Sequence, residues 1–272
     1  MEIAVTHART LAVLALCSLL AVLPQAAGAQ EHDADALAKQ LSNPVAALIS
    51  VPMQLNWDTG YANDGEKLLL NVQPVIPISL NDHWNLISRT ILPLIDQHDV
   101  VNSGSQSGLG DTLQSFFFSP KAPTASGWIW GVGPAALLPT ATDDLLGQEQ
   151  WALGPTAVML KQTESGWTYG ALVNQLWSVA GDDDRPDVNA MFVQPFLTKG
   201  LGQGRTVVLN LESTYDWERS QWTVPANLMY SKVSKLGSQL VSWQGGIRGY
   251  LDAPEGGPDW GLRFTFTLLF PR

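Results

Sequence analysis

The segment WGLRFTFTLLF, residues 260–270, decides the fold class. Apolar side chains stand at every second position from Trp260 to Phe270, and glycine, arginine and threonine fill most of the positions between them. Such strict alternation predicts a β-strand with one apolar and one polar face. The same pattern recurs in residues 49–57, 68–80 and 167–179, so the chain is predicted to be built mainly of strands.

These alternating segments number about twelve. They lie at 47–57, 67–80, 84–95, 109–118, 128–138, 150–161, 167–179, 188–198, 206–215, 222–231, 239–251 and 259–270. Most have about 10 residues, whereas strands in soluble proteins usually have about 5–6, and about 9–11 are needed to cross a bilayer with tilt. An even number of long hairpin-connected strands can close without a free edge. We therefore predict an all-β fold, a transmembrane antiparallel up-and-down β-barrel, with a short N-terminal helical segment.

The N-terminus has the features of a secretory signal peptide. Arg9 precedes the apolar run Leu11 to Leu23, and an A-x-A site follows at residues 27–29, so cleavage is expected before Gln30. Cys17 lies inside this run, and bulky Leu16 before it disfavours the alternative of a lipoprotein site. We expect three parts, which are a signal peptide (1–29), an N-terminal periplasmic segment (30–46) and the outer-membrane barrel (47–272).

Tryptophan placement supports the barrel. Most tryptophans fall near predicted strand ends, where a bilayer interface would lie, and Trp243 in mid-strand is the exception. The tryptophans near predicted strand ends are Trp57, Trp84, Trp128, Trp130, Trp151, Trp167, Trp177, Trp222 and Trp260.

Charge also sorts by connection. With a periplasmic N-terminus, the odd-numbered connections face outward and hold Asp58, Asp64, Asp96, Asp99, Asp143, Asp144, Glu149, Asp182, Asp183, Asp184, Asp187, Asp216, Glu218, Asp252, Glu255 and Asp259. The even-numbered connections hold mainly lysine and arginine. We therefore predict an acidic outer mouth, with Asp143, Asp144, Asp182, Asp183, Asp184 and Asp187 as candidates.

No catalytic constellation emerges from the sequence. There is no Gly-x-Ser-x-Gly motif, and His83 and His98 fall in turns at opposite ends of the predicted barrel. The acidic run Asp182 to Asp184 lacks the spacing of a calcium loop. It favours a solvated loop tip, and the alternative is a loosely held divalent ion that bridges lipopolysaccharide phosphates. We expect no enzyme activity, no cofactor and no metal site, and the net charge of −10 disfavours nucleic-acid binding.

Four charged residues fall on the non-apolar faces of predicted strands. A charge facing lipid near the bilayer centre costs about 2–4 kcal/mol, so such residues should face the lumen. They are Arg89, Glu212, Arg248 and Arg263, accompanied by Asn71, Gln73, Asn174, Asn210 and Gln244, with Asp111 as a further candidate. Whether they fill a narrow lumen or line an open one stays undecided, because twelve strands lie between filled and open barrel sizes.

Several segments resemble a family of bacterial outer-membrane proteins named after the meta-pathway of phenol degradation. They are LSNPVAALISVP (41–52), QPVIPISLNDHWNLISRTILPLI (73–95), GLGDTLQSFFFSPK (108–121), WGVGPAALLPTATDD (130–144), GPTAVMLKQ (154–162), GDDDRPD (181–187) with its flanks, ESTYDWE (212–218) and PEGGPDWGLRFTFTLLFPR (254–272). The resemblance implies an outer-membrane β-barrel that transports small molecules, hydrophobic ones among them. It implies no catalytic or binding residues.

Two function classes follow from these observations. The leading hypothesis is a passive channel for small organic solutes in the outer membrane of a Gram-negative bacterium, and the alternative is a closed barrel with a structural or surface-binding role. A soluble periplasmic β-sandwich is a third possibility. The expected partners are outer-membrane lipid and lipopolysaccharide, a small-molecule solute, and the barrel-assembly machinery, for which Phe270 is the expected anchor.

Overall fold

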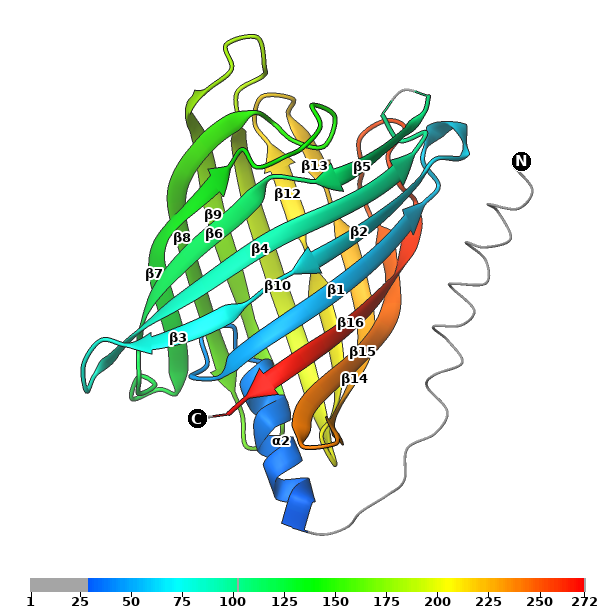
Figure 1. The fold of residues 1–272 in the computed structure, drawn as a ribbon. Helices are drawn as coiled ribbons and strands as arrows, with labels where there is room; N and C mark the ends of the chain where they lie inside the picture. The colour runs from blue at the N-terminus through cyan, green and yellow to red at the C-terminus, as the bar shows by residue number, and fades with distance from the viewer. Residues whose placement is uncertain (1–28, 102, 272) are drawn as a thin grey trace.

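A single antiparallel sheet closes on itself to form a barrel (Figure 1). The structure, a computed structural model, describes residues 29–101 and 103–271, so the predicted signal peptide, with Cys17, lies outside the described residues apart from Ala29. Sixteen strand segments form the sheet, and four of the barrel strands are each interrupted once, which leaves twelve strands. The predicted fold class, a β-barrel with a short N-terminal helix, is confirmed.

The strands follow one another as hairpins around the barrel. The helix is α2 (Ala29–Leu41), and the strands are β1 (Ile49–Thr59), β2 (Glu66–Val72), β3 (Val75–Ser79), β4 (Trp84–His98), β5 (Ser105–Leu109), β6 (Thr112–Pro120), β7 (Trp128–Leu138), β8 (Gln150–Gln162), β9 (Trp167–Gly181), β10 (Asn189–Gly202), β11 (Arg205–Leu211), β12 (Ser213–Asp216), β13 (Gln221–Thr223), β14 (Pro225–Leu236), β15 (Gln239–Tyr250) and β16 (Trp260–Phe270).

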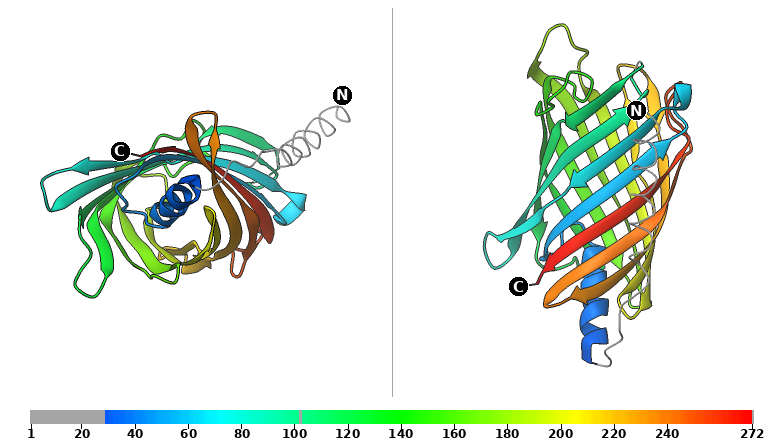
Figure 2. Two further views of the ribbon diagram at one scale, coloured as in Figure 1. Left: turned by 90° about the horizontal axis from the view of Figure 1, so that it is seen from below. Right: turned by 45° about the vertical axis from the view of Figure 1, so that its right-hand side comes forward.

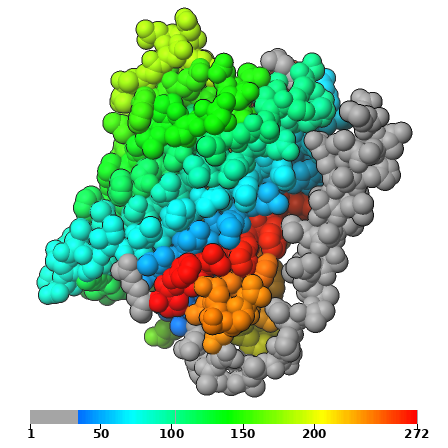
Figure 3. Space-filling view, viewed as in Figure 1, coloured from blue at the N-terminus to red at the C-terminus, as the bar shows by residue number. Residues whose placement is uncertain are grey.

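The first and last strands close the barrel. β1 pairs with β16 along its whole length, from Ile49 opposite Phe270 to Thr59 opposite Trp260. This long register leaves no free edge between the two ends of the chain. In the space-filling view, side chains of β4, β1 and β16 form a continuous wall (Figure 3).

Two of the four interruptions lie at Pro74 and at Glu212. Pro74 lies in the break between β2 and β3, and a proline has no N–H to donate to a neighbouring strand. Glu212 lies between β11 and β12, and its backbone N–H donates to Pro225 of the adjacent strand. The second break places a carboxylate, rather than a regular strand residue, inside the barrel.

The two ends of the barrel differ in the length of their connections. One end, called here the short-turn end, carries tight turns, and two of these share the sequence Thr-x-Ser-Gly-Trp at residues 124–128 and 163–167. In both, the threonine hydroxyl accepts a hydrogen bond from the tryptophan N–H at 3.0 Å, and a glycine with φ of +81° or +82° makes the turn. The opposite end carries the longer loops.

The outer surface of the strands is apolar. On β16, Trp260, Leu262 and Phe270 are exposed, while Arg263 and Thr265 on the other face are buried. Aromatic side chains pack in pairs near both ends, such as Trp84 on Trp130 and Trp57 on Trp260. This arrangement suits a barrel surrounded by lipid. Among the described helices, none is both long and apolar enough to span a membrane.

Helix α2 enters the barrel at the short-turn end. Seen from below, it lies within the outline of the strands (Figure 2), and the C-terminus lies at the same end. Leu37 and Ala38 are buried against Leu48, Val233 and Leu269. The inward-facing side chains are apolar here, because they form the surface against which the helix packs.

Candidate functional site

Three polar side chains from three strands meet in the barrel interior. Arg263 on β16 donates from Nη1 and Nη2 to the two carboxylate oxygens of Glu212, each at 2.6 Å. Its Nε donates to Asn56 Oδ1 of β1, also at 2.6 Å. Arg263 is 3% exposed and Asn56 is 1% exposed. A bidentate, fully hydrogen-bonded pair of this kind offsets the cost of taking both charges out of water.

Arg89 extends this group to the other side of the barrel. It lies on β4, which is six strands from the β11–β12 strand in the ring of twelve, so Arg89 and Glu212 belong to opposite walls. Arg89 interacts electrostatically with Glu212 and donates one hydrogen bond, from Nη2 to Gln73 Oε1 at 3.0 Å. We call Asn56, Arg89, Glu212 and Arg263 the charged layer, because together they cross the interior.

A second ion pair lies between the charged layer and the long loops. Arg248 Nε is 3.2 Å from Asp58 Oδ1, at an angle outside hydrogen-bond geometry, and Arg248 Nη2 donates to the Tyr250 hydroxyl at 3.0 Å. Lys67 adds a further positive charge that interacts with Asp58. At the loop end, burial and the Asp58 charge raise the pKa of Tyr61, so this hydroxyl stays protonated at neutral pH.

The short-turn end is closed by the N-terminal segment. Besides the apolar contacts of α2, Val45 is buried among Ile87, Phe117, Leu160 and other inward-facing residues. Two hydrogen bonds attach the helix to the short-turn end of the barrel. Gly204 N–H donates to Asp35 Oδ1 at 2.6 Å, and Gln162 Nε2 donates to the Lys39 carbonyl at 2.7 Å. The segment therefore obstructs this end of the lumen.

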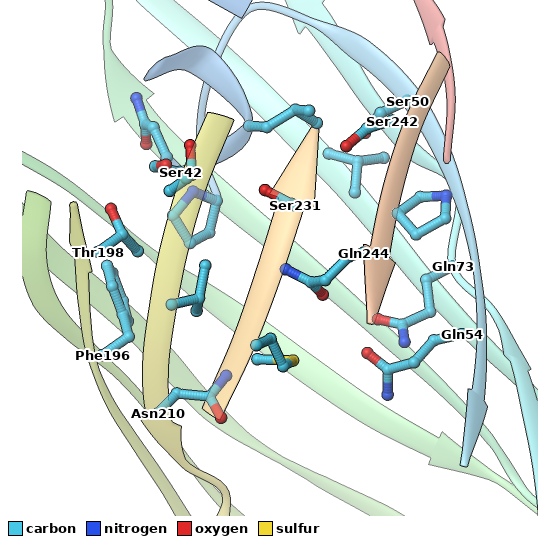
Figure 4. Close-up of a pocket in the computed structure, with 18 of the residues that line it drawn as sticks. Ser42, Ser50, Gln54, Gln73, Phe196, Thr198, Asn210, Ser231, Ser242 and Gln244 are labelled. Carbon is cyan, nitrogen blue, oxygen red and sulfur yellow. The ribbon is translucent and has the colours of Figure 1, made fainter. Parts of the chain in front are cut away.

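A cavity of about 400 Å³ lies between the N-terminal segment and the charged layer (Figure 4). Its walls come from several strands and from residues 38–46, and hydroxyl and amide side chains such as Ser231, Thr198 and Gln244 face into it. Arg89, Glu212 and Arg263 line it as well. A second cavity of about 280 Å³ shares the lining residues Ala38, Ser42, Thr198 and Thr206, so the two adjoin beside the helix.

The acidic candidates gather at the long-loop end. All six side chains are exposed, and they lie in the connections β7–β8 and β9–β10: Asp143, Asp144, Asp182, Asp183, Asp184 and Asp187. Arg185 joins the two loops, since its Nε is 3.0 Å from Glu149 Oε2 and its Nη2 donates to the carbonyls of Asp144 and Gly147. The Asp182 carboxylate accepts from the Asp184 N–H at 2.8 Å, which is the bond of a tight turn.

No metal-binding cluster of His, Cys, Asp or Glu side chains is found in residues 29–101 and 103–271. The carboxylates of the interior are held by arginines instead. Asp111, which the sequence offered as a further interior residue, lies apart from the charged layer. Its two carboxylate oxygens accept from Ala141 N–H and Gln148 N–H, so it fixes the β7–β8 loop.

No protein-family model matches the chain, and no curated protein matches its sequence. Among solved structures, the chain is similar to a COG4313 outer membrane channel from Pseudomonas putida F1. The identity is 16%, over 82% of this chain and 96% of that chain, and the TM-score is 0.66. It also matches an outer membrane phospholipase (OMPLA) dimer from Salmonella typhi with 12% identity, over 89% and 98% of the two chains, at a TM-score of only 0.48. The chain thus has the fold of an outer-membrane β-barrel channel.

Sequence reasoning assigned Asp58 to the acidic loops, and the structure places it in the interior. Strand β1 runs to Thr59, beyond the predicted end at residue 57, so Asp58 continues the inward face that includes Gln54 and Asn56. The period-two pattern already contained this signal. The sequence does not predict that the N-terminal segment packs inside the barrel. This packing depends on inward-facing apolar residues, such as Val233 and Leu269, that lie at the ends of different strands.

Proposed function

We propose that the protein is a channel for small organic solutes in the outer membrane of a Gram-negative bacterium. The N-terminal segment and the charged layer close its lumen at rest. The fold of an outer-membrane channel, the apolar outer surface and the aromatic pairs near both ends support this location. The long loops with their acidic side chains would face outward, and α2 would face the periplasm.

The observation that carries the proposal is the cavity of about 400 Å³ inside the barrel. A barrel with a purely structural role needs no internal space lined by both polar and apolar side chains. Cavities of about 300–1,000 Å³ are typical of small-molecule sites. The obstruction on each side of the cavity is made of side chains and one short helix, which can move without breaking the strand pairing.

The resemblance to the phenol meta-pathway family supports small, hydrophobic or aromatic molecules as the solutes. On this proposal, outer-membrane lipid, lipopolysaccharide and the barrel-assembly machinery are the partners of the barrel. The signal peptide would direct its export.

The rival function is a closed barrel that conducts nothing. The buried contacts of Leu37 and Val45 and the Arg263–Glu212 pair favour it, because these side chains would lose their partners if the lumen opened. The two functions differ in whether solute crosses the barrel.

Solute flux into proteoliposomes tests the proposal. The full chain should admit small organic solutes faster than protein-free liposomes do, and Arg263→Gln should change the rate because it opens the charged layer. Correct folding is verified by the shift in gel mobility on heating. Absence of flux, together with unchanged solute uptake in a deletion strain, would favour the closed barrel.

A further inference from the structure

The barrel interior holds more positive than negative charge. Among the described residues, the mutually interacting ionised groups of the interior are the cations Lys67, Arg89, Arg248 and Arg263 and the carboxylates Asp58 and Glu212. Four cations against two carboxylates leave two positive charges. The interior is thus opposite in sign to the exposed acidic loops, and an uncompensated cation there gains from a bound anion.

Arg89 is the cation of the charged layer that has no hydrogen-bonded carboxylate among the described residues. Glu212 is held by both terminal nitrogens of Arg263, so its charge is largely taken up by that pair. Within the described part of the chain, Arg89 donates a single hydrogen bond, to the neutral amide of Gln73. Most of its guanidinium N–H donors therefore stay available.

Arg89 lines the 400 Å³ cavity and keeps part of its surface exposed there. A carboxylate matches the planar fork of a guanidinium and forms short, charge-assisted hydrogen bonds with it. Gln73 and Gln194 line the same cavity, where Gln73 accepts a hydrogen bond from Arg89 and Gln194 donates one to Glu212. One part of the cavity lining thus carries a cation with free hydrogen-bond donors.

The rest of the cavity accepts an apolar body. Phe192 and Phe196 of β10 line it, together with Val75, Ile91, Val208 and Met229. Figure 4 shows Phe196 beside the cavity, on the wall that also carries Thr198. Aromatic and aliphatic walls of this kind favour a ring or a short chain over a fully hydrated inorganic ion.

We propose that this cavity binds a small organic acid as its anion, with the carboxylate on Arg89 and the apolar part against Phe192 and Phe196. The proposal rests on the proposed channel, whose solute class it names, but equilibrium binding can be measured without passage. A barrel that binds the anion and conducts nothing would overturn only the channel, and a conducting barrel that does not bind it would overturn only this site.

Isothermal titration of the purified full chain in detergent tests the site with benzoate as the probe. Benzamide is the neutral control and benzylamine is the cationic control. Both are compared with benzoate on the unaltered protein. Benzoate should bind, and both controls should bind at least about tenfold more weakly, which is the loss expected for a charge-assisted hydrogen bond. Equal binding of benzoate and benzamide would overturn the proposal.

Variants then locate the site. Arg89→Gln should weaken benzoate about tenfold or more, and Phe196→Ala should weaken benzoate while leaving phosphate and chloride unchanged. Arg219→Gln, at an exposed ion pair with Asp216, is the matched control and should bind like the unaltered chain. Unchanged binding in Arg89→Gln would overturn the assignment. Chloride and phosphate are tested as competitors for bound benzoate. If either binds as tightly as benzoate does, the cavity is a site for inorganic anions, and the proposal of an organic acid is overturned.

Discussion

Arg263 binds both carboxylate oxygens of Glu212 at 2.6 Å, although 51 residues separate the two in the chain. The contact joins β16 to the break between β11 and β12. Around the barrel, β16 is three strands from the β11–β12 strand. It pairs one cation of the charged layer, and it leaves Arg89 as the cavity-lining cation whose hydrogen bond goes to a neutral amide. The stability of the barrel and the polarity of the lumen therefore depend on the same pair.

Replacing Glu212 by Gln should destabilise the barrel. The substitution removes the carboxylate that both terminal nitrogens of buried Arg263 contact, and breaking a buried ion pair costs about 3–5 kcal/mol. The free energy of unfolding from urea titration in detergent measures the loss. Asp216→Asn, which breaks the exposed pair with Arg219, is the control and should cost about 1 kcal/mol or less. Equal losses for the two variants would show that the Glu212 pair contributes no more than a surface pair.

Replacing Leu37 by Asp should release helix α2 from the barrel. Leu37 is 7% exposed and packs in an apolar cluster, so a carboxylate there would be buried without a partner. Hydrogen exchange of residues 34–41 should become faster, while exchange in the strands stays unchanged. Ala36→Asp, on the exposed side of the same helix, should leave the exchange as it is. Slow exchange in Leu37→Asp would mean that the helix is held by other contacts.

Replacing Phe264 by Arg should test which face meets lipid. Phe264 lies in the middle of β16 on the outward side, where it packs with Trp243. An arginine near the bilayer midplane costs about 2–4 kcal/mol, and near the interface about 0–1 kcal/mol. Folding into phosphatidylcholine bilayers, followed by urea titration, should therefore show a large loss for Phe264→Arg and a small one for Trp260→Arg. Similar losses of stability at both positions would contradict a lipid-facing surface on which Phe264 lies near the bilayer midplane and Trp260 near the interface.

Replacing Arg185 by Gln should loosen the acidic loops without affecting the barrel. Arg185 links the β9–β10 connection to Glu149 and to two carbonyls of the β7–β8 connection. Limited proteolysis should cut residues 182–188 faster in this variant. The free energy of unfolding should change by about 1 kcal/mol or less, because the Arg185–Glu149 pair lies in a loop and is partly exposed to solvent. Unchanged cleavage would show that the turn around Asp182 holds the loop by itself.

The barrel is predictable from the sequence because its signal is local and repeated. Alternation such as that of residues 260–270 indicates the strand and its two faces at once, and an even number of long, hairpin-connected strands fits a closed barrel. Strand limits were less exact. The predicted strand 67–80 is two segments, β2 and β3, since the ladder is broken around Pro74.

The interior is only partly predictable, because partners come from distant strands. Alternation indicates that Arg263 and Glu212 leave the apolar face, but their pairing depends on the shape of the closed barrel. Arg248 and Asp58 illustrate the same limit, since the acidic residue at a strand end resembles a loop residue until the register is known. The cavity and the packing of α2 depend on the whole ring of strands and have no local signature.

Conductance in planar bilayers tests most directly whether this barrel is a channel closed by its N-terminal segment. The full chain should give small, discrete current steps, and Leu37→Asp should give larger or more frequent ones, while Ala36→Asp behaves like the unaltered chain. Silence of both the full chain and Leu37→Asp, after their insertion has been verified, would contradict a channel with a movable obstruction.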